Sequence, residues 1–225
     1  MNHLGGHANV CNLDIGVLKW IKSMNMNSFL DVGCGTGEMI IAADKEGLSS
    51  WGIDGDTEVK RNTDKVTIVD FSKESIPDTL MKNSWDVIYS TEFLEHITEK
   101  DFDERCSSVF KRAKQMIIIT AAPIGWGGHH HVNENTHEYW LKKFNELGYE
   151  HDIVLTKMLR ESSTMNTNRK KQKQFMKHRG LVFVPMKKDT LITQYAEIED
   201  VKNNVFQKKT KRLFKSYIPA VKRII

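Results

Sequence analysis

Residues 29–38 read Phe29-Leu30-Asp31-Val32-Gly33-Cys34-Gly35-Thr36-Gly37-Glu38. An apolar run ends in an acid and breaks into alternating glycines, and the next residues, Met39-Ile40-Ile41-Ala42-Ala43, resume with helical character. Because the glycines have no Cβ, a ligand can approach the backbone, and the first amides of the helix face that ligand. The stretch predicts a buried strand that turns sharply into a helix around a nucleotide-like ligand.

A second acid lies where the next strand of a Rossmann-like unit is expected to end. Trp51-Gly52-Ile53-Asp54 is a short apolar run, and Asp54 follows Gly37 by 17 residues. The turn reads G-x-G-x-G, which differs from the dinucleotide pattern G-x-G-x-x-G. This spacing disfavours a nicotinamide-dependent oxidoreductase. The alternative interpretation is a glycine-rich structural turn with an unrelated surface acid at position 54.

The pattern DVGCGTG resembles the first motif of class I S-adenosylmethionine-dependent methyltransferases. In that family the glycine turn packs against the methionyl part of the cofactor, and the acid after the second strand holds the ribose hydroxyls. The resemblance implies S-adenosylmethionine as the cofactor. It places the following residues against that cofactor: Asp31, Gly33, Cys34, Gly35, Gly37, Asp54 and Gly55.

The composition fits one soluble α/β domain with additions. The chain has 225 residues, of which 40% are hydrophobic and 28% charged, and it contains no apolar run long enough for a membrane span. A basic-then-apolar signal pattern is missing at the N-terminus, so we expect a cytoplasmic protein. The cysteines at positions 11, 34 and 106 are odd in number and widely spaced, which indicates reduced thiols rather than a metal cluster. Cys34 is interpreted as a packing residue, not a nucleophile.

Val66-Thr67-Ile68-Val69-Asp70-Phe71 is predicted to be a third strand that ends in an acid and an aromatic residue. In the methyltransferase family, residues at this position contact adenine, the acid through the exocyclic amine and the apolar neighbour through the ring face. Asp70 and Phe71 fit those roles. The alternative is that Asp70 caps the turn that follows.

A fourth strand is predicted at 85–90, and Thr91-Glu92-Phe93-Leu94-Glu95-His96 follows it. The segment resembles the family's "DxI…LEH" segment, which lies beside the cofactor and the mouth of the substrate pocket. The resemblance places Ser90 or Thr91 near the sulfonium. Glu95 and His96 are candidates for proton handling, or alternatively hold the loop in place.

The remaining pattern completes the sheet. Apolar residues at helical spacing predict a helix that starts near Phe102 and reaches Ala113, and Met116–Ala122 is predicted to be a buried fifth strand. The stretches 150–156 and 180–185 are predicted to be an antiparallel pair at the sheet edge, and the basic run 169–173 between them a solvated surface. The expected fold is a doubly wound, Rossmann-like α/β fold with a mostly parallel seven-stranded sheet, whose last strand is antiparallel.

Adjacent histidines mark the loop after the fifth strand, which reads Gly127-Gly128-His129-His130-His131-Val132-Asn133. Adjacent side chains cannot easily ligate one ion together, so no metal site is predicted. With the aromatic helix that follows, the loop resembles a subgroup of bacterial and viral methyltransferases often associated with saccharide or other small-molecule modification. A neutral imidazole here could accept a proton from an attacking hydroxyl. We favour His131, with His130 close behind.

The two ends of the chain are predicted to be additions to a methyltransferase core at 29–187. Residues 1–28 are expected to form a helical lid, in which His7 could approach the active site, although a disordered polar terminus fits as well. Residues 188–225 are predicted to be a basic amphipathic helical extension. That extension could dock on its own domain, mediate a homodimer, lie on an anionic membrane or grip nucleic acid.

The leading functional hypothesis is O-methylation of a saccharide or another small hydroxylated acceptor. A nucleic-acid methyltransferase is the nearest rival because of the basic tail. Against it, the fourth strand is not followed by the Asn/Asp-Pro-Pro-Tyr/Phe motif of amino-methylating DNA enzymes. A Lys-Asp-Lys-Glu set of the ribose-methylating kind is not evident either. A non-catalytic cofactor-binding scaffold is the other alternative.

Overall fold

The computed structural model describes residues 11–170 and 173–187. The predicted C-terminal extension at 188–225, and His7 of the predicted lid, lie outside these residues. None of the described helices is both long and apolar enough to cross a bilayer.

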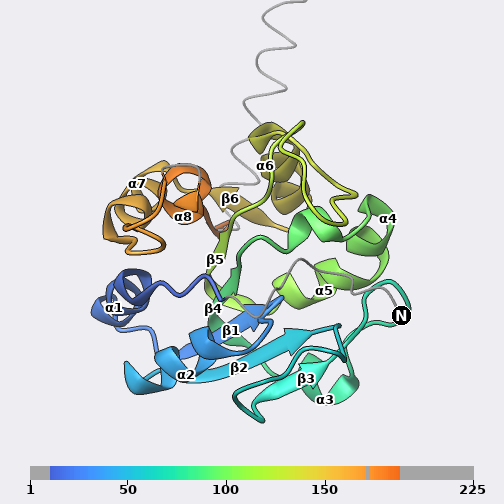
Figure 1. Cartoon of the computed structure of the whole chain (residues 1–225), viewed down its shortest axis with the longest axis horizontal. Helices are drawn as coiled ribbons and strands as arrows, with labels where there is room; N and C mark the ends of the chain where they lie inside the picture. The colour runs from blue at the N-terminus through green and yellow to red at the C-terminus, as the bar shows by residue number, and fades with distance from the viewer. Residues whose placement is uncertain (1–10, 171–172, 188–225) are drawn as a thin grey trace, which may run out of the picture. The chain divides into compact units, whose positions relative to one another are not determined.

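The described residues form one α/β unit (Figure 1). The strands are β1 Ser28–Val32, β2 Ser49–Asp54, β3 Val66–Ile68, β4 Trp85–Ser90, β5 Ala113–Ile119, β6 Tyr149–His151 and β7 Leu181–Pro185. The helices are α1 Ile15–Ser23, α2 Glu38–Lys45, α3 Asp78–Met81, α4 Glu99–Asp101, α5 Ser107–Phe110, α6 His137–Glu146, α7 Ile153–Ser162 and α8 Phe175–Arg179. A 3₁₀ turn at Leu94–His96 follows β4, and a π-helical segment at Phe102–Cys106 joins α4 to α5.

The strands form a single seven-stranded sheet in the order β3-β2-β1-β4-β5-β7-β6. Strands β1 to β5 pair in parallel, whereas β7 runs antiparallel to both β5 and β6. The predicted fold class is confirmed. Because the strand order reverses between β1 and β4, the carboxyl ends of these two strands form the crevice in which doubly wound folds bind ligands.

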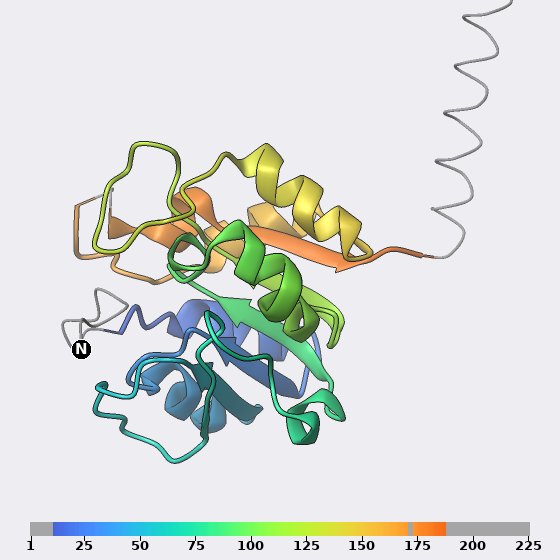
Figure 2. The same cartoon turned by 90° about the vertical axis from the view of Figure 1, so that its right-hand side faces the viewer.

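Helices cover both faces of the sheet, and each face has its own apolar core. Buried side chains of α1, α2, α7 and α8 pack with those of Phe29, Tyr89 and Met116 on one face. Side chains of α3, α5 and α6 pack on the other face, where the Phe144 ring contacts those of Phe102 and Phe110 edge to face. Figure 2 shows the loops that follow β2, β5 and α7 together at one end of the molecule. The sheet is therefore a rigid platform with its long loops at that end.

The strand predicted at 150–156 is wrong beyond His151. The chain leaves β6 and enters α7, because the Asp152 carboxylate caps the new helix by accepting a hydrogen bond from the Leu155 amide at 2.8 Å. Leu159 is fully buried against the core of the α1 face, whereas Ile153 and Val154 remain exposed. A run of apolar residues thus became a helix with one buried face.

Boundaries also moved around the fifth strand. Ala113, predicted at the end of a helix, is the first residue of β5, and the strand ends at Ile119 rather than at Ala122. The buried face predicted for the preceding helix is confirmed, since Phe102, Cys106 and Val109 are all at most 1% exposed.

Hydrogen bonds connect the start of helix α1 to the segment after α7. The Asp14 carboxylate caps α1 through the Val17 amide and also accepts hydrogen bonds from the Ser163 hydroxyl at 2.5 Å and the Thr164 amide at 2.8 Å. Cys11 and Asn12, just before this cap, line the larger cavity described below. Residues 11 and 12 therefore lie at the edge of that cavity, and the helical lid expected at 1–28 stays a prediction.

Candidate active site

The glycine turn follows β1 and bends as the sequence predicts. Gly33, Gly35 and Gly37 have φ values of 82°, 52° and 87°, in the left-handed region that side chains rarely adopt. A Cβ on Gly33 would overlap the Phe93 ring, and Gly37 is the cap residue from which α2 begins. The turn accordingly needs glycine for its backbone conformation and for the close approach of its neighbours.

Asp54, at the end of β2, organises this turn. Its carboxylate accepts hydrogen bonds from the Gly35 amide at 2.8 Å and the Asp56 amide at 2.9 Å, and it forms an ion pair with Arg61 at 3.2 Å. The side chain is buried, yet it lines a cavity. The role of Arg61 could not be predicted from the sequence, because an arginine in a polar loop carries no signal that points to a particular carboxylate.

Asp31 lies within β1, and its carboxyl group reaches the larger cavity. Burial, with a smaller contribution from the negative charge of Asp54, raises its pKa to about 8. The carboxyl is therefore mostly protonated at neutral pH.

Cys34 packs against the sheet. Its sulfur lies where a Cβ on Gly52 would fall, and the side chain is only 5% exposed. Burial raises the pKa of its thiol well above the ordinary value, as expected for a packing residue rather than a nucleophile.

A smaller, largely apolar cavity of about 240 Å³ lies beside the ends of β2 and β3. It is lined in part by Asp54, Gly55, Asp70, Phe71 and Phe93. The Asp70 carboxylate accepts hydrogen bonds from both the amide and the hydroxyl of Ser72, and it forms an ion pair with Lys73. Burial raises the pKa of Asp70, but these hydrogen bonds outweigh it and lower the pKa. Asp70 thus caps the following turn, as one of the two interpretations expected, and also lines the cavity.

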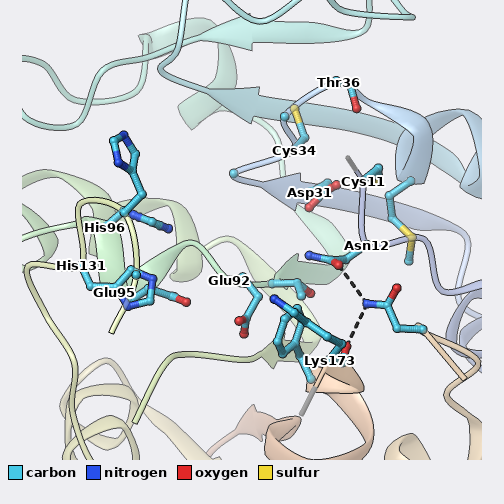
Figure 3. Close-up of a pocket in the computed structure, with 18 of the residues that line it drawn as sticks. Cys11, Asn12, Asp31, Cys34, Thr36, Glu92, Glu95, His96, His131 and Lys173 are labelled. Atoms are coloured by element: carbon cyan, nitrogen blue, oxygen red, sulfur yellow. Dashed lines mark hydrogen bonds between the residues drawn. The ribbon is translucent and has the colours of Figure 1, made fainter. Parts of the chain in front are cut away.

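A larger cavity of about 400 Å³ begins at the glycine turn and reaches the histidine loop. Gly33, Glu92 and His96 line both cavities, so the two adjoin at these residues. In Figure 3, Asp31, Cys34 and Thr36 lie on one side of the larger cavity, and Glu95, His96 and His131 lie on the other. Thr91 lines it as well, whereas Gly37 and Ser90 line neither cavity. The Ser90 hydroxyl is fully buried and donates to the Val32 carbonyl at 2.9 Å.

The histidine loop presents its imidazoles in different directions. His131 Nδ1 lies 2.7 Å from a Glu134 carboxylate oxygen, and the same carboxylate accepts hydrogen bonds from the Gly125 and Gly127 amides. His130 has a φ of 54° and lines the smaller cavity, and its carbonyl lies 3.2 Å from His96 Nδ1. Glu134 therefore fixes both the fold of the loop and the ring of His131.

Glu95 and Glu92 lie beneath this loop. The Glu95 carbonyl accepts hydrogen bonds from the Val132 and Asn133 amides, at 2.8 and 3.0 Å, which attaches the loop to the end of β4. Burial, and then the negative charge of Glu92, raise the pKa of the Glu95 carboxyl to about 8. Glu92 itself is paired with Arg179 at 2.6 Å and accepts a hydrogen bond from the Thr120 hydroxyl.

Several lining residues of the larger cavity were not predicted. Arg169 and Lys173 come from the segment that the sequence analysis interpreted as a solvated surface, and Asn166 and Trp126 are nearby. Asn166 donates hydrogen bonds to the Asn12 side chain and the Lys173 carbonyl, which are the dashed lines that end at the labelled Asn12 and Lys173 in Figure 3. The basic run was the only signal in the sequence, and it could not indicate which part of the molecule the run would face.

A scan against protein families matches a model described as a methyltransferase domain over residues 22–151, which is more than half of the chain. The chain belongs to this methyltransferase family. Its members use S-adenosylmethionine, so the protein is an S-adenosylmethionine-dependent methyltransferase, as the glycine motif predicts. The match includes the glycine turn, Asp54 and the 3₁₀ turn with Glu95 and His96. A search of the curated proteins found no match.

Solved structures confirm the class I fold. Magnesium protoporphyrin IX methyltransferase from Synechocystis PCC 6803, with bound S-adenosylmethionine, is 15% identical, with a TM-score of 0.51 over 76% of each chain. A TehB-like methyltransferase from Corynebacterium glutamicum is 18% identical, with a TM-score of 0.51 over 77% of this chain and 88% of that chain. The sugar N-methyltransferase KedS8 from a Streptoalloteichus species is 12% identical, with a TM-score of 0.53 over 76% of this chain and 87% of that chain. At these identities the likeness concerns the fold alone.

Proposed function

We propose that the protein methylates a hydroxyl group of a small acceptor, in the first place a saccharide. The observation that carries this proposal is the His131–Glu134 pair, which lies in the same cavity as the glycine turn. A hydroxyl is a poor nucleophile until it loses its proton, so its methylation is favoured by a base within reach.

The two adjoining cavities fit the two halves of the cofactor. The smaller one offers Phe71 for the face of adenine, Asp70 for its amine and Asp54 for the ribose hydroxyls, and Gly55 lets the end of β2 lie close to the backbone of Val69 and Asp70. The larger one offers Asp31 to the methionyl group, and the missing side chains of Gly33 and Gly35 let that group approach the backbone. The sulfonium then lies where the cavities adjoin, close to Thr91. Gly37 and Ser90 support this arrangement from outside the cavities, through the start of α2 and the hydrogen bond from Ser90 to Val32, while Cys34 lines the larger cavity beside the glycine turn.

His131 is the candidate base. Because Glu134 holds Nδ1, the other ring nitrogen, Nε2, can take the proton of the acceptor hydroxyl, and the carboxylate stabilises the imidazolium that forms. The acceptor oxygen then attacks the methyl carbon, the bond from carbon to sulfur breaks, and S-adenosylhomocysteine leaves. His130 lines the other cavity, and its carbonyl supports His96. Glu95, with its raised pKa, holds the loop rather than accepting a proton at neutral pH.

The chemistry of the larger cavity favours a hydroxylated acceptor that carries an acidic group. Trp126 offers an aromatic face of the kind that packs on the apolar face of a sugar ring, and the side-chain oxygen of Asn166 can accept a hydrogen bond from a hydroxyl. Arg169 and Lys173 add positive charge, which would attract a carboxylate or a phosphate.

The test is to incubate the protein with isotopically labelled S-adenosylmethionine and an extract of metabolites and glycans, and to follow the methyl label by mass spectrometry. We expect label on a hydroxyl of a small acidic acceptor. With that acceptor, His131→Ala should lower kcat about 10²- to 10⁴-fold and leave the Kd of the cofactor unchanged. The matched control is His178→Ala, on an exposed position of α8. Label in nucleic acid alone, or cofactor binding without transfer to any acceptor, would overturn the proposal.

A further inference from the structure

Three side chains from different segments converge at the wall of the larger cavity, under the histidine loop. Glu95 and His96 come from the 3₁₀ turn after β4, and His131 comes from the loop after β5. A carboxylate oxygen of Glu95 and a nitrogen of each imidazole all lie within 4.8 Å of one another. Figure 3 shows these side chains grouped together. The adjacent histidines of the loop do not share one centre, since only His131 of the three belongs to this group.

We propose that Glu95, His96 and His131 bind one divalent transition-metal ion, in the first place Zn²⁺, with a coordination position open to the larger cavity. This proposal goes against the expectation from the sequence that the chain has no metal site. Two imidazoles and one carboxylate are the ligands of a common class of catalytic zinc sites, in which a further position stays open for water or substrate. Mg²⁺ prefers oxygen ligands, so it is a poorer match to this group.

The buried carboxylate of Glu95 is the first reason to expect an ion. The side chain is fully buried, and neither of its oxygens has a hydrogen bond of good geometry among the described residues. The backbone amides of Glu95 and Ala122, as weak hydrogen-bond donors, and the charge of Arg179 lower the pKa of Glu95, but burial and the charge of Glu92 outweigh them. A buried carboxylate needs a cation or hydrogen-bond donors. Arg179, the nearby arginine, is already paired with Glu92.

The orientation of both rings is the second reason. His131 Nδ1 is held by the Glu134 carboxylate, and His96 Nδ1 lies 3.2 Å from the His130 carbonyl. Histidines that ligate metals almost always use the second ring nitrogen in this way, toward a carboxylate or a backbone carbonyl. A cation would then be met by Nε2 of each ring.

Gly128 provides the space for such a ligand. A Cβ at this position would overlap the Nε2 edge of the His131 ring, so any other residue would block that nitrogen. Zinc binds nitrogen and oxygen ligands at about 2.0–2.2 Å, so tetrahedral ligand atoms lie roughly 3.3 Å apart. The ligand atoms lie within 4.8 Å of one another without an ion, so they would have to move closer together to bind one.

The site itself does not depend on the identity of the acceptor, whereas its use in catalysis rests on the proposed function. The two roles of His131 exclude each other at Nε2, because a lone pair that binds a cation cannot accept a proton. In the loaded protein, the ion would bind the acceptor hydroxyl at its open position and lower the pKa of that hydroxyl, and the proton would pass to water as the oxygen takes the methyl group from the sulfonium.

The experiment titrates the tag-free full chain, stripped by a chelator and dialysed, with ZnCl₂ in a calorimeter. We expect one equivalent to bind, with the affinity lowered at least 100-fold in His131→Ala and Glu95→Gln and about 10- to 100-fold in Glu134→Gln. His129→Ala removes an imidazole from the same loop and should bind like the unmodified protein. Co²⁺ should give the visible bands of a four- or five-coordinate site in the unmodified protein, independently of how the variants fold. Cofactor affinity, measured on each variant, reports whether it is folded.

The outcomes separate the two proposals. Absence of stoichiometric binding, or equal affinity in a folded Glu95→Gln or His131→Ala variant, overturns the metal site. If the chelated, zinc-free protein transfers methyl groups to a hydroxyl at an undiminished rate, the metal ion has no role in catalysis, while the proposed function stays intact. Tight binding of one Zn²⁺ at these residues without transfer to any hydroxyl supports the metal site and overturns the proposed function.

Discussion

The cofactor side of the active site is built from residues that lie close together in the sequence, whereas the histidine side joins segments that lie far apart. Asp31, the glycine turn and Asp54 come from two consecutive strands and the helix between them. Glu95 and His131 come from loops that follow different strands, and Lys173 comes from the segment after α7. Such local construction makes the cofactor side readable from a motif, while the other side depends on how the whole sheet is assembled.

This difference implies that substitutions on the two sides affect different measured quantities. Variants on the cofactor side should change the affinity for S-adenosylmethionine. Variants on the histidine side should change turnover, or the affinity for the acceptor, with the cofactor affinity preserved.

The largest effect on cofactor binding is expected from Asp54→Ala. The substitution removes the partner of the Gly35 amide and of Arg61, together with the proposed contact to the ribose. Hydrogen bonds that involve a charged group contribute about 1.5–3 kcal/mol each, so the Kd should rise by about 100-fold or more. Calorimetry with S-adenosylmethionine measures this, with Asp64→Ala as the control on an exposed position of the same loop. An unchanged Kd would remove Asp54 from the cofactor site.

An intermediate, pH-dependent effect is expected from Asp31. The cofactor carries an ammonium and a sulfonium, which favour the ionised carboxylate. Because the pKa of this carboxyl is raised to about 8, the affinity should increase as the pH rises from 6 to 8. The increase should reach up to about tenfold per pH unit. Asp31→Asn should bind more weakly and without this pH dependence. Equal pH profiles for the two proteins would contradict the assignment.

The Asp31 carboxyl should also make the stability of the protein depend on pH, but here a rise in pH lowers the stability. The carboxyl has a pKa near 3.8 when unfolded and about 8 when folded, so the folded protein holds the extra proton between these values. Raising the pH through this interval therefore costs stability. Asp31→Asn should increase the free energy of unfolding at pH 8 by ~1–3 kcal/mol, with a smaller gain near pH 5, as measured by urea denaturation.

The smallest effect is expected from Lys173→Ala, on the acceptor side. Exposed ion pairs contribute up to about 1 kcal/mol, so the KM of an acidic acceptor should rise roughly three- to fivefold. The rise should shrink at high salt, while the cofactor Kd stays the same. Lys177→Ala, an exposed position of α8, is the control. If the acceptor KM is unchanged at low salt, the acceptor carries no acidic group at this end of the cavity.

The sequence by itself determined the sheet, the glycine turn and the class of cofactor. Buried parallel strands are visible in the sequence as continuous apolar runs, and a left-handed turn is visible as glycine, because both depend on the properties of the residues themselves. The run at 150–156 shows the limit of such a prediction. Its apolar residues suited a strand, but the Asp152 cap and the burial of Leu159 made most of it a helix.

Only the tertiary structure decided the histidine side. Three adjacent histidines gave no reason to choose one as a ligand, and it was the pairing of β4 with β5 that brought Glu95 and His96 to His131. Arg169 and Lys173 of the basic run likewise became part of a cavity wall, because α8 packs against α7 and Asn166 forms hydrogen bonds with Asn12 and Lys173. Contacts between distant segments leave no periodic trace in the sequence, because each depends on where the other segment is held.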